Sequence, residues 1–167
     1  MYYLFQEVQQ NVPGASGTAV LFNLSNYANT QNYSLYSYYI MTCFWDSILT
    51  CLKDDDYRFA NIGKGNHKHF ITQLKLRNKP IKSIKWQGEK LREQEIKEHM
   101  EAIKDYNING IRGGHLTSVC DSFLLLICEL FHINIVHRYL NSNISYSHHN
   151  PRKTFKFNSN KGHFQIG

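Results

Sequence analysis

The sequence predicts one α+β domain, with helices in its first part and a sheet in its last part. Three observations support this fold class. Apolar residues recur at helical spacing over 43–52 and 88–105, and the stretch 116–131 is apolar nearly all round. From residue 133 onward, apolar and polar residues alternate as they do in half-buried strands. We therefore expect a small mixed sheet flanked by helices, with one buried helix at the centre.

The length of the chain sets the number of domains. It has 167 residues, of which 42% are hydrophobic, which is enough for one core but hardly for two. The polar and aromatic N-terminal residues, interrupted by Pro13-Gly14, predict an arm over 1–35. Residues 36–167 are then expected to form a single globular domain.

The first helix is expected over 43–52, where Phe44, Ile48 and Leu52 share one face. The acidic run 54–56 follows it. We interpret this run as a solvated turn rather than a metal site, because no further acidic ligands follow nearby.

The middle of the chain predicts a loop and two helices. Residues 61–67 are glycine-rich but lack the full spacing of a phosphate-binding loop, so they indicate an ordinary turn. A short helix is expected over 67–77 and a charged surface helix over 88–105, which carries His99.

The last part of the chain predicts the core helix and the sheet. The helix over 116–131 is expected to be buried, and strands are expected over 133–140 and near 144–146. Alternating apolar residues on both sides of a turn predict a β-hairpin over 154–166.

Composition limits the classes of partner. The net charge is +6, but the basic residues are scattered and most frequent over 75–104, so nucleic acid is not the expected ligand.

The four cysteines form no CxxC pair, and no apolar run has the roughly 20 residues that span a bilayer. We expect a reduced, cytoplasmic monomer without a cofactor. Zinc binding by His148 and His149 with a cysteine is not expected either, since their spacing matches no zinc motif.

Two remote residues suggest thiol chemistry. Cys43 lies where a turn enters a helix, and the N–H groups and dipole of a helix N-terminus favour a thiolate. His163 follows Gly162 at the expected start of the last strand, with Gln165 on the same face. A cysteine with a remote histidine base is the arrangement of a thiol protease. Read singly, Cys43 also fits a small core residue and His163 a surface residue.

Three segments together resemble the ovarian tumour (OTU) family of cysteine proteases, which are mostly deubiquitinases. The family's Asp-Gly-Asn-Cys-Leu/Phe-Phe/Trp motif corresponds to Ile40-Met41-Thr42-Cys43-Phe44-Trp45. Its Trp-Gly-Gly segment, with the helix and strand that follow, corresponds to the chain from Arg112-Gly113-Gly114 to Val136. Its final His-Tyr/Phe-Asp/Asn corresponds to His163-Phe164-Gln165. The resemblance covers roughly residues 36–167 and implies an OTU-like, papain-like fold.

The resemblance also implies roles for single residues. Cys43 would be the nucleophile and His163 the base, and the backbone N–H groups of Thr42 and Cys43 would form the oxyanion hole. Gly113 and Gly114 would lie beside the substrate tail. Trp45 is a substrate-site candidate, although packing behind the nucleophile is the favoured interpretation.

The chain departs from the family pattern at two places. Ile40 replaces the acid three residues before the nucleophile, and Gln165 replaces the acid after the histidine. Gln165 can orient the imidazole as a neutral amide does in papain-like enzymes. A plain Cys–His dyad, or a polar group from the arm such as Glu7 or Asn11, remains an alternative.

The expected function is that of a cysteine isopeptidase that cleaves after the Gly-Gly end of ubiquitin or a ubiquitin-like protein. A polyprotein-processing protease and an inactive, ubiquitin-binding OTU-like domain are the alternatives. The compact, Asn- and Lys-rich chain resembles viral OTU-like proteases more than cellular ones, which implies action in a host cytosol.

Overall fold

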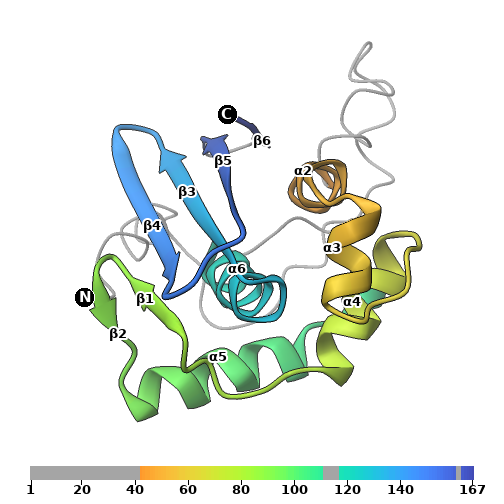
Figure 1. The fold of residues 1–167 in the computed structure, drawn as a ribbon, viewed down its shortest axis with the longest axis horizontal. Coiled ribbons are helices and arrows are strands. Elements are labelled where there is room, and N and C mark those ends of the chain that lie inside the picture. Colours follow the sequence, from red (N-terminus) through yellow and green to blue (C-terminus); the bar gives the residue numbers. More distant parts are fainter. Residues whose placement is uncertain (1–41, 111–116, 161–162) are drawn as a thin grey trace, which may run out of the picture. The chain divides into compact units, whose positions relative to one another are not determined.

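The computed structural model describes residues 42–110, 117–160 and 163–167, all within one compact unit. These residues form five α-helices and one six-stranded mixed sheet (Figure 1). The predicted α+β class is therefore confirmed. The predicted arm over 1–35 and its boundary at residue 36 lie outside the described residues.

The element labels follow Figure 1. The helices are α2 (Cys43–Cys51), α3 (Asp54–Phe59), α4 (His67–Leu76), α5 (Glu93–Asp105) and α6 (Thr117–Phe131), with a short 3-10 turn, η3 (Ile108–Gly110). The strands are β1 (Ile84–Trp86), β2 (Glu89–Lys90), β3 (Ile133–Tyr139), β4 (Ser142–His148), β5 (Lys153–Ser159) and β6 (Phe164–Ile166).

The sheet has the strand order β2-β1-β4-β3-β5-β6. Only β3 and β5 pair in parallel, in register from Ile133 with Lys153 to Tyr139 with Ser159. All the other neighbours are antiparallel. The predicted hairpin over 154–166 is confirmed as β5 and β6, and β6 forms one edge of the sheet.

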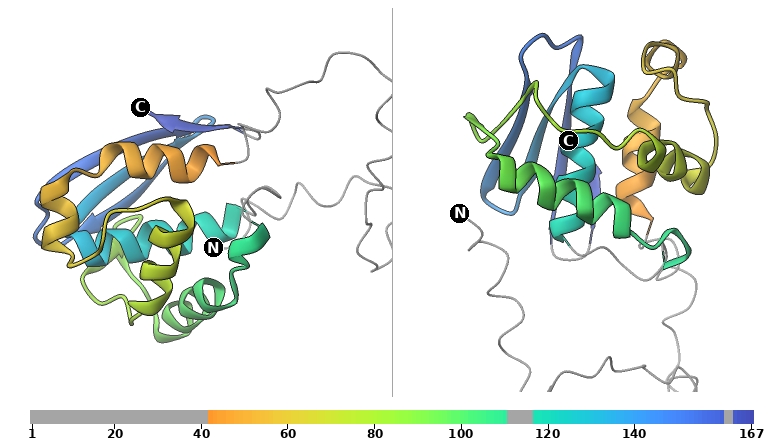
Figure 2. Two further views of the ribbon diagram at one scale, coloured as in Figure 1. Left: turned by 90° about the vertical axis from the view of Figure 1, so that its right-hand side faces the viewer. Right: turned by 90° about the horizontal axis from the view of Figure 1, so that it is seen from below.

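Helix α6 is the central element, as its sequence predicted. It packs against β1, β3 and β4 on one side and against α3, α4 and α5 on the other. Figure 2 shows α6 below the sheet and α2 close to the strand that ends at the C-terminus. The run 123–128 in α6 is completely buried, because the helix is covered on all sides. This core holds the sheet and the helices in a fixed relation.

The expected helix over 88–105 begins later than predicted, at Glu93. The residues before it form the hairpin of β1 and β2, in which Trp86 pairs with Glu89. Gln87 and Gly88 form its two-residue turn, both with positive φ (53° and 85°), the conformation that such hairpin turns require. This hairpin extends the sheet beyond the strands that alternation predicted.

The acidic run 54–56 is not a solvated turn, because it forms the first turn of α3. Asp56 is fully buried and makes ion pairs with Lys153 at 2.7 Å and Arg152 at 3.1 Å. A buried carboxylate requires such partners, since an unpaired buried charge is very costly. The run therefore ties α3 to the start of β5.

His99, which was expected on a surface helix, is buried, and so is His148. His99 faces inward from α5, and its Nδ1 lies 2.9 Å from the hydroxyl of Ser122. His148 is the last residue of β4, and its ring stacks on that of His132 with 4.3 Å between the centroids. Within the described ranges, no helix is long and apolar enough to cross a bilayer.

Candidate active site

The start of α2 lies against β6, although the two elements are far apart in the sequence. The rings of Phe44 and Phe164 meet edge to face, with 5.0 Å between their centroids. The hydroxyl of Ser47 donates to the backbone carbonyl of Phe164 at 3.3 Å. Packing and hydrogen bonding together therefore hold the last strand on the first turns of this helix.

Cys43 is the first residue of α2 and is partly exposed. Its sulfur accepts the backbone N–H of Phe164 at 3.3 Å. This hydrogen bond orients the sulfur at the N-terminal, positive end of the helix dipole. The position of Cys43 therefore suits a nucleophile.

His163 directly precedes β6 and is exposed. The strand begins at Phe164, one residue later than expected. The backbone N–H of Asn160 donates to the carbonyl of His163 at 3.0 Å, which closes the turn between β5 and β6. His163 is thus the chain neighbour of the residue whose N–H contacts the Cys43 sulfur.

The residue that would orient the His163 ring is less well defined than Cys43 and His163. Gln165 is exposed and pairs with Asn158 of β5, so both amides lie on the outer face of the hairpin. Within residues 42–110, 117–160 and 163–167, no hydrogen bond joins Gln165 to the His163 ring, so its role stays a prediction. Asn158 is a second amide on this face that sequence reasoning missed. The cross-strand register, which the sequence does not state, brings it there.

Trp45 lies in the core rather than on a substrate-facing surface. Its side chain is only 1% exposed and packs edge to face on Phe44 and Phe123, each at 4.8 Å. This burial matches the interpretation that it packs behind the nucleophile. Gly113 and Gly114 lie outside the described residues, so their expected place beside a substrate stays a prediction.

Sequence reasoning missed a polar chain at the start of α2. The hydroxyl of Thr42 donates to one carboxylate oxygen of Asp46 at 2.7 Å. The other carboxylate oxygen lies 2.7 Å from Nε2 of His67, the first residue of α4. An acid one turn after the cysteine was the only available signal. The sequence separation between Asp46 and His67 gave no signal of their contact.

Strand β3, which pairs with β5 on the side away from β6, supports the hairpin further. Nε2 of His137 in β3 lies 2.6 Å from the hydroxyl of Ser159, the last residue of β5. The His137 ring also packs on Phe164, with 5.1 Å between centroids. Burial lowers the pKa of His137 to about 4, so the ring is neutral at physiological pH.

The other thiols are poor nucleophiles. Burial raises the pKa of Cys51 and of Cys128 above the usual cysteine value. Burial likewise raises the pKa of Cys120, to which the charges of Asp121 and Cys43 contribute. The thiolates of these three residues are therefore disfavoured, and Cys43 is the cysteine placed for chemistry.

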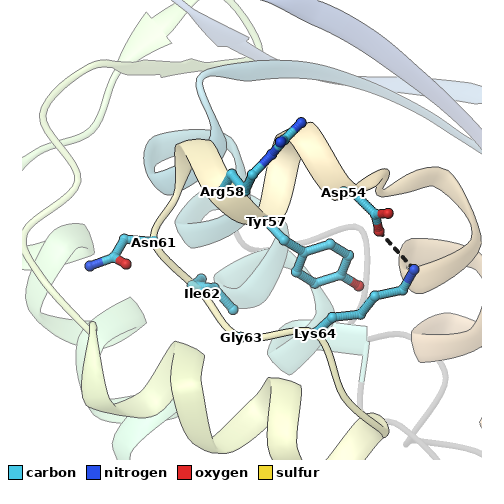
Figure 3. Close-up of a pocket in the computed structure, with 7 residues that line it drawn as sticks. All are labelled: Asp54, Tyr57, Arg58, Asn61, Ile62, Gly63 and Lys64. Carbon is cyan, nitrogen blue, oxygen red and sulfur yellow. Dashed lines mark hydrogen bonds and ion pairs between the residues drawn. The ribbon is translucent and has the colours of Figure 1, made fainter.

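A separate hollow of about 370 Å³ lies over α3 and the glycine loop that follows it (Figure 3). On one side of it, the Lys64 ammonium and the Asp54 carboxylate form an exposed ion pair at 2.8 Å. A Cβ at Gly65 would lie 2.6 Å from the His69 ring, so this glycine is needed for close packing. The glycine loop thus has a structural reason.

In the part of the chain that the structure describes, no group of three His, Cys, Asp or Glu side chains is placed to hold a metal ion. His148 and His149 stack on each other at 4.5 Å.

No protein-family model, curated protein or solved structure significantly matches this chain.

Proposed function

We propose that this chain is a cysteine isopeptidase of the OTU type, with a papain-like arrangement of its nucleophilic helix and histidine-bearing hairpin. The hydrogen bond from the Phe164 N–H to the Cys43 sulfur carries the proposal. It brings the residue after the expected base into contact with the expected nucleophile, across most of the chain. The order of the three family-like segments is the second support.

In the proposed reaction, the Cys43 thiolate attacks the carbonyl carbon of the substrate's terminal glycine. His163 accepts the thiol proton and later gives it to the leaving lysine amine. The backbone N–H groups of Thr42 and Cys43 stabilise the oxyanion of the tetrahedral intermediate. A water molecule then hydrolyses the thioester, with His163 as the base, and releases the Gly-Gly carboxylate.

The substrate class follows from the resemblance. We infer that ubiquitin or a ubiquitin-like protein supplies the Gly-Gly tail. Gly113 and Gly114 would lie beside that tail, where small residues let a narrow peptide approach. Gln165, with Asn158 beside it, is the proposed orienter of His163.

Labelling with an electrophilic probe tests this function. Ubiquitin with a C-terminal electrophile should add once to the wild-type chain, and mass spectrometry should locate the adduct on Cys43. Cys43→Ala should lose both the adduct and the cleavage of ubiquitin chains. Cys51→Ala is the matched control, because Cys51 is a partly exposed thiol at the other end of the same helix.

The remaining outcomes separate the alternatives. Full labelling of Cys43→Ala would end the proposal. Binding of ubiquitin without any adduct would instead indicate an inactive, ubiquitin-binding domain. Cleavage of a Gly-Gly peptide from a longer chain, without ubiquitin binding, would indicate a processing protease.

A further inference from the structure

We infer that Asp46 is a positioning residue that fixes the backbone at Thr42 for oxyanion binding. This inference rests on the proposed function of Cys43. The evidence is the hydrogen-bonded chain of Thr42, Asp46 and His67, which we call the Thr42 clamp. The clamp lies beside the proposed nucleophile and uses residues that the proposed chemistry does not otherwise need.

The clamp holds Thr42 at two points. The Asp46 carboxylate accepts the Thr42 hydroxyl, and the Asp46 backbone N–H donates to the Thr42 carbonyl at 2.9 Å. Both bonds join the residue before Cys43 to the helix one turn later. The peptide bond between Thr42 and Cys43, which carries the Cys43 N–H, therefore has a fixed direction relative to α2.

The Thr42 hydroxyl has an unusual use for a helix N-cap. A threonine there normally accepts a backbone N–H of the first helical turn. Here its side chain caps no N–H and donates to Asp46 instead. The Thr42 hydroxyl is therefore used as a donor that joins Thr42 to Asp46.

His67 fixes the carboxylate from the other side. Its Nε2 lies 2.7 Å from the second oxygen of Asp46, so both carboxylate oxygens are engaged. His67 begins α4, and the side chain of Asn66 caps that helix by accepting the N–H of His69 at 3.0 Å. The clamp thus joins the start of α2 to the start of another helix.

The position of the clamp addresses a departure in the sequence. Ile40 stands where an acid would precede the nucleophile. Asp46, three residues after Cys43, supplies a carboxylate that binds Thr42 from inside the helix. Its side chain is 51% exposed, and exposed pairs contribute little to folding stability, which leaves alignment as its main effect.

The test compares two reactions of Cys43 in the full chain. Hydrolysis of a ubiquitin C-terminal fluorogenic amide needs an oxyanion, whereas alkylation by iodoacetamide does not. Asp46→Ala should lower kcat by about tenfold to a hundredfold, somewhat less than the loss of a complete oxyanion donor. KM and the alkylation rate should stay within about twofold of wild type, and inhibition by ubiquitin aldehyde should weaken as kcat falls.

Two further variants strengthen the test. The kcat of Thr42→Val should fall as far as that of Asp46→Ala, and the kcat of the double variant should fall no further. Thr42→Ser, which keeps the hydroxyl, should retain a higher kcat than Thr42→Val. Asp54→Ala is the matched control, because Asp54 is an exposed carboxylate in a first helical turn with one cationic partner. Circular dichroism should report folded protein throughout.

Each other outcome decides against the inference. An unchanged kcat in Asp46→Ala would overturn the clamp while the proposed function stands. An equal loss of hydrolysis and alkylation would assign Asp46 to the thiol or to the fold. A wild-type chain that neither hydrolyses the amide nor reacts with ubiquitin aldehyde would overturn the proposed function and the clamp with it.

Discussion

Protonation of His137 is expected to loosen the fold beneath the candidate site. The His137 side chain is only 6% exposed, and burial lowers its pKa from the usual 6.5 to about 4. The folded state therefore keeps the ring neutral, while an unfolded chain binds a proton near pH 6.5. As pH falls from 6.5 toward 4, the unfolded state binds more protons, and stability falls.

The size of the effect follows from the two pKa values. At about 1.4 kcal/mol per pKa unit, stability should fall by about 2 kcal/mol between pH 7.5 and 5.0, and by about 3 kcal/mol at pH 4. Urea unfolding, followed by tryptophan fluorescence, measures this fall. The contribution should vanish in His137→Leu.

A matched variant separates titration from hydrogen bonding. Ser159→Ala removes the hydroxyl that lies 2.6 Å from His137 Nε2 but keeps the buried ring. It should lower stability at every pH while retaining most of the acid-dependent loss. If wild type and His137→Leu lose stability in parallel between pH 7.5 and 5.0, the reasoning is refuted.

Replacement of two buried carboxylates is expected to change stability in opposite directions. Burial raises the pKa of Asp121 to about 6, so the folded state prefers its neutral form, and stability is lost as pH rises from 3.8 through 6. Asp121→Asn should therefore gain stability relative to wild type between pH 4 and 7, by at most about 3 kcal/mol in urea unfolding. An equal difference at both pH values would contradict this. Asp56→Ala should lose about 1–3 kcal/mol, because the Lys53 N–H, Arg152 and Lys153 would lose their buried acceptor, although Asp55 still pairs with both cations. Thermal unfolding measures this loss. Asp54→Ala, at an exposed position, should change stability little in the same experiment, and similar losses in both variants would contradict the burial argument.

The sequence predicted the elements that carry strong periodicity. The apolar stretch of α6 and the alternation in β3, β5 and β6 correspond to what the structure shows. Burial on all sides, or on one face, leaves a direct pattern in residue type. The adjacency of Cys43 and the segment at His163 was inferred from chemistry and resemblance rather than from periodicity.

The sequence could not show features that depend on a remote partner. In the sequence, Asp56 looks like part of an acidic turn. In the structure, Arg152 and Lys153, at the start of β5, pair with it. His99 stands among charged residues, yet its partner Ser122 belongs to a different helix. The Thr42 clamp has the same cause, because His67 reaches Asp46 only when α4 packs beside α2.

The contact between the Cys43 sulfur and the Phe164 N–H joins positions 121 residues apart. In a chain still being synthesised, α2 emerges from the ribosome long before the last strand exists. Under the proposed function, the thiol would lack its base, His163, throughout that time. Proteolytic activity would then arise only after β6 has been made and has folded against α2.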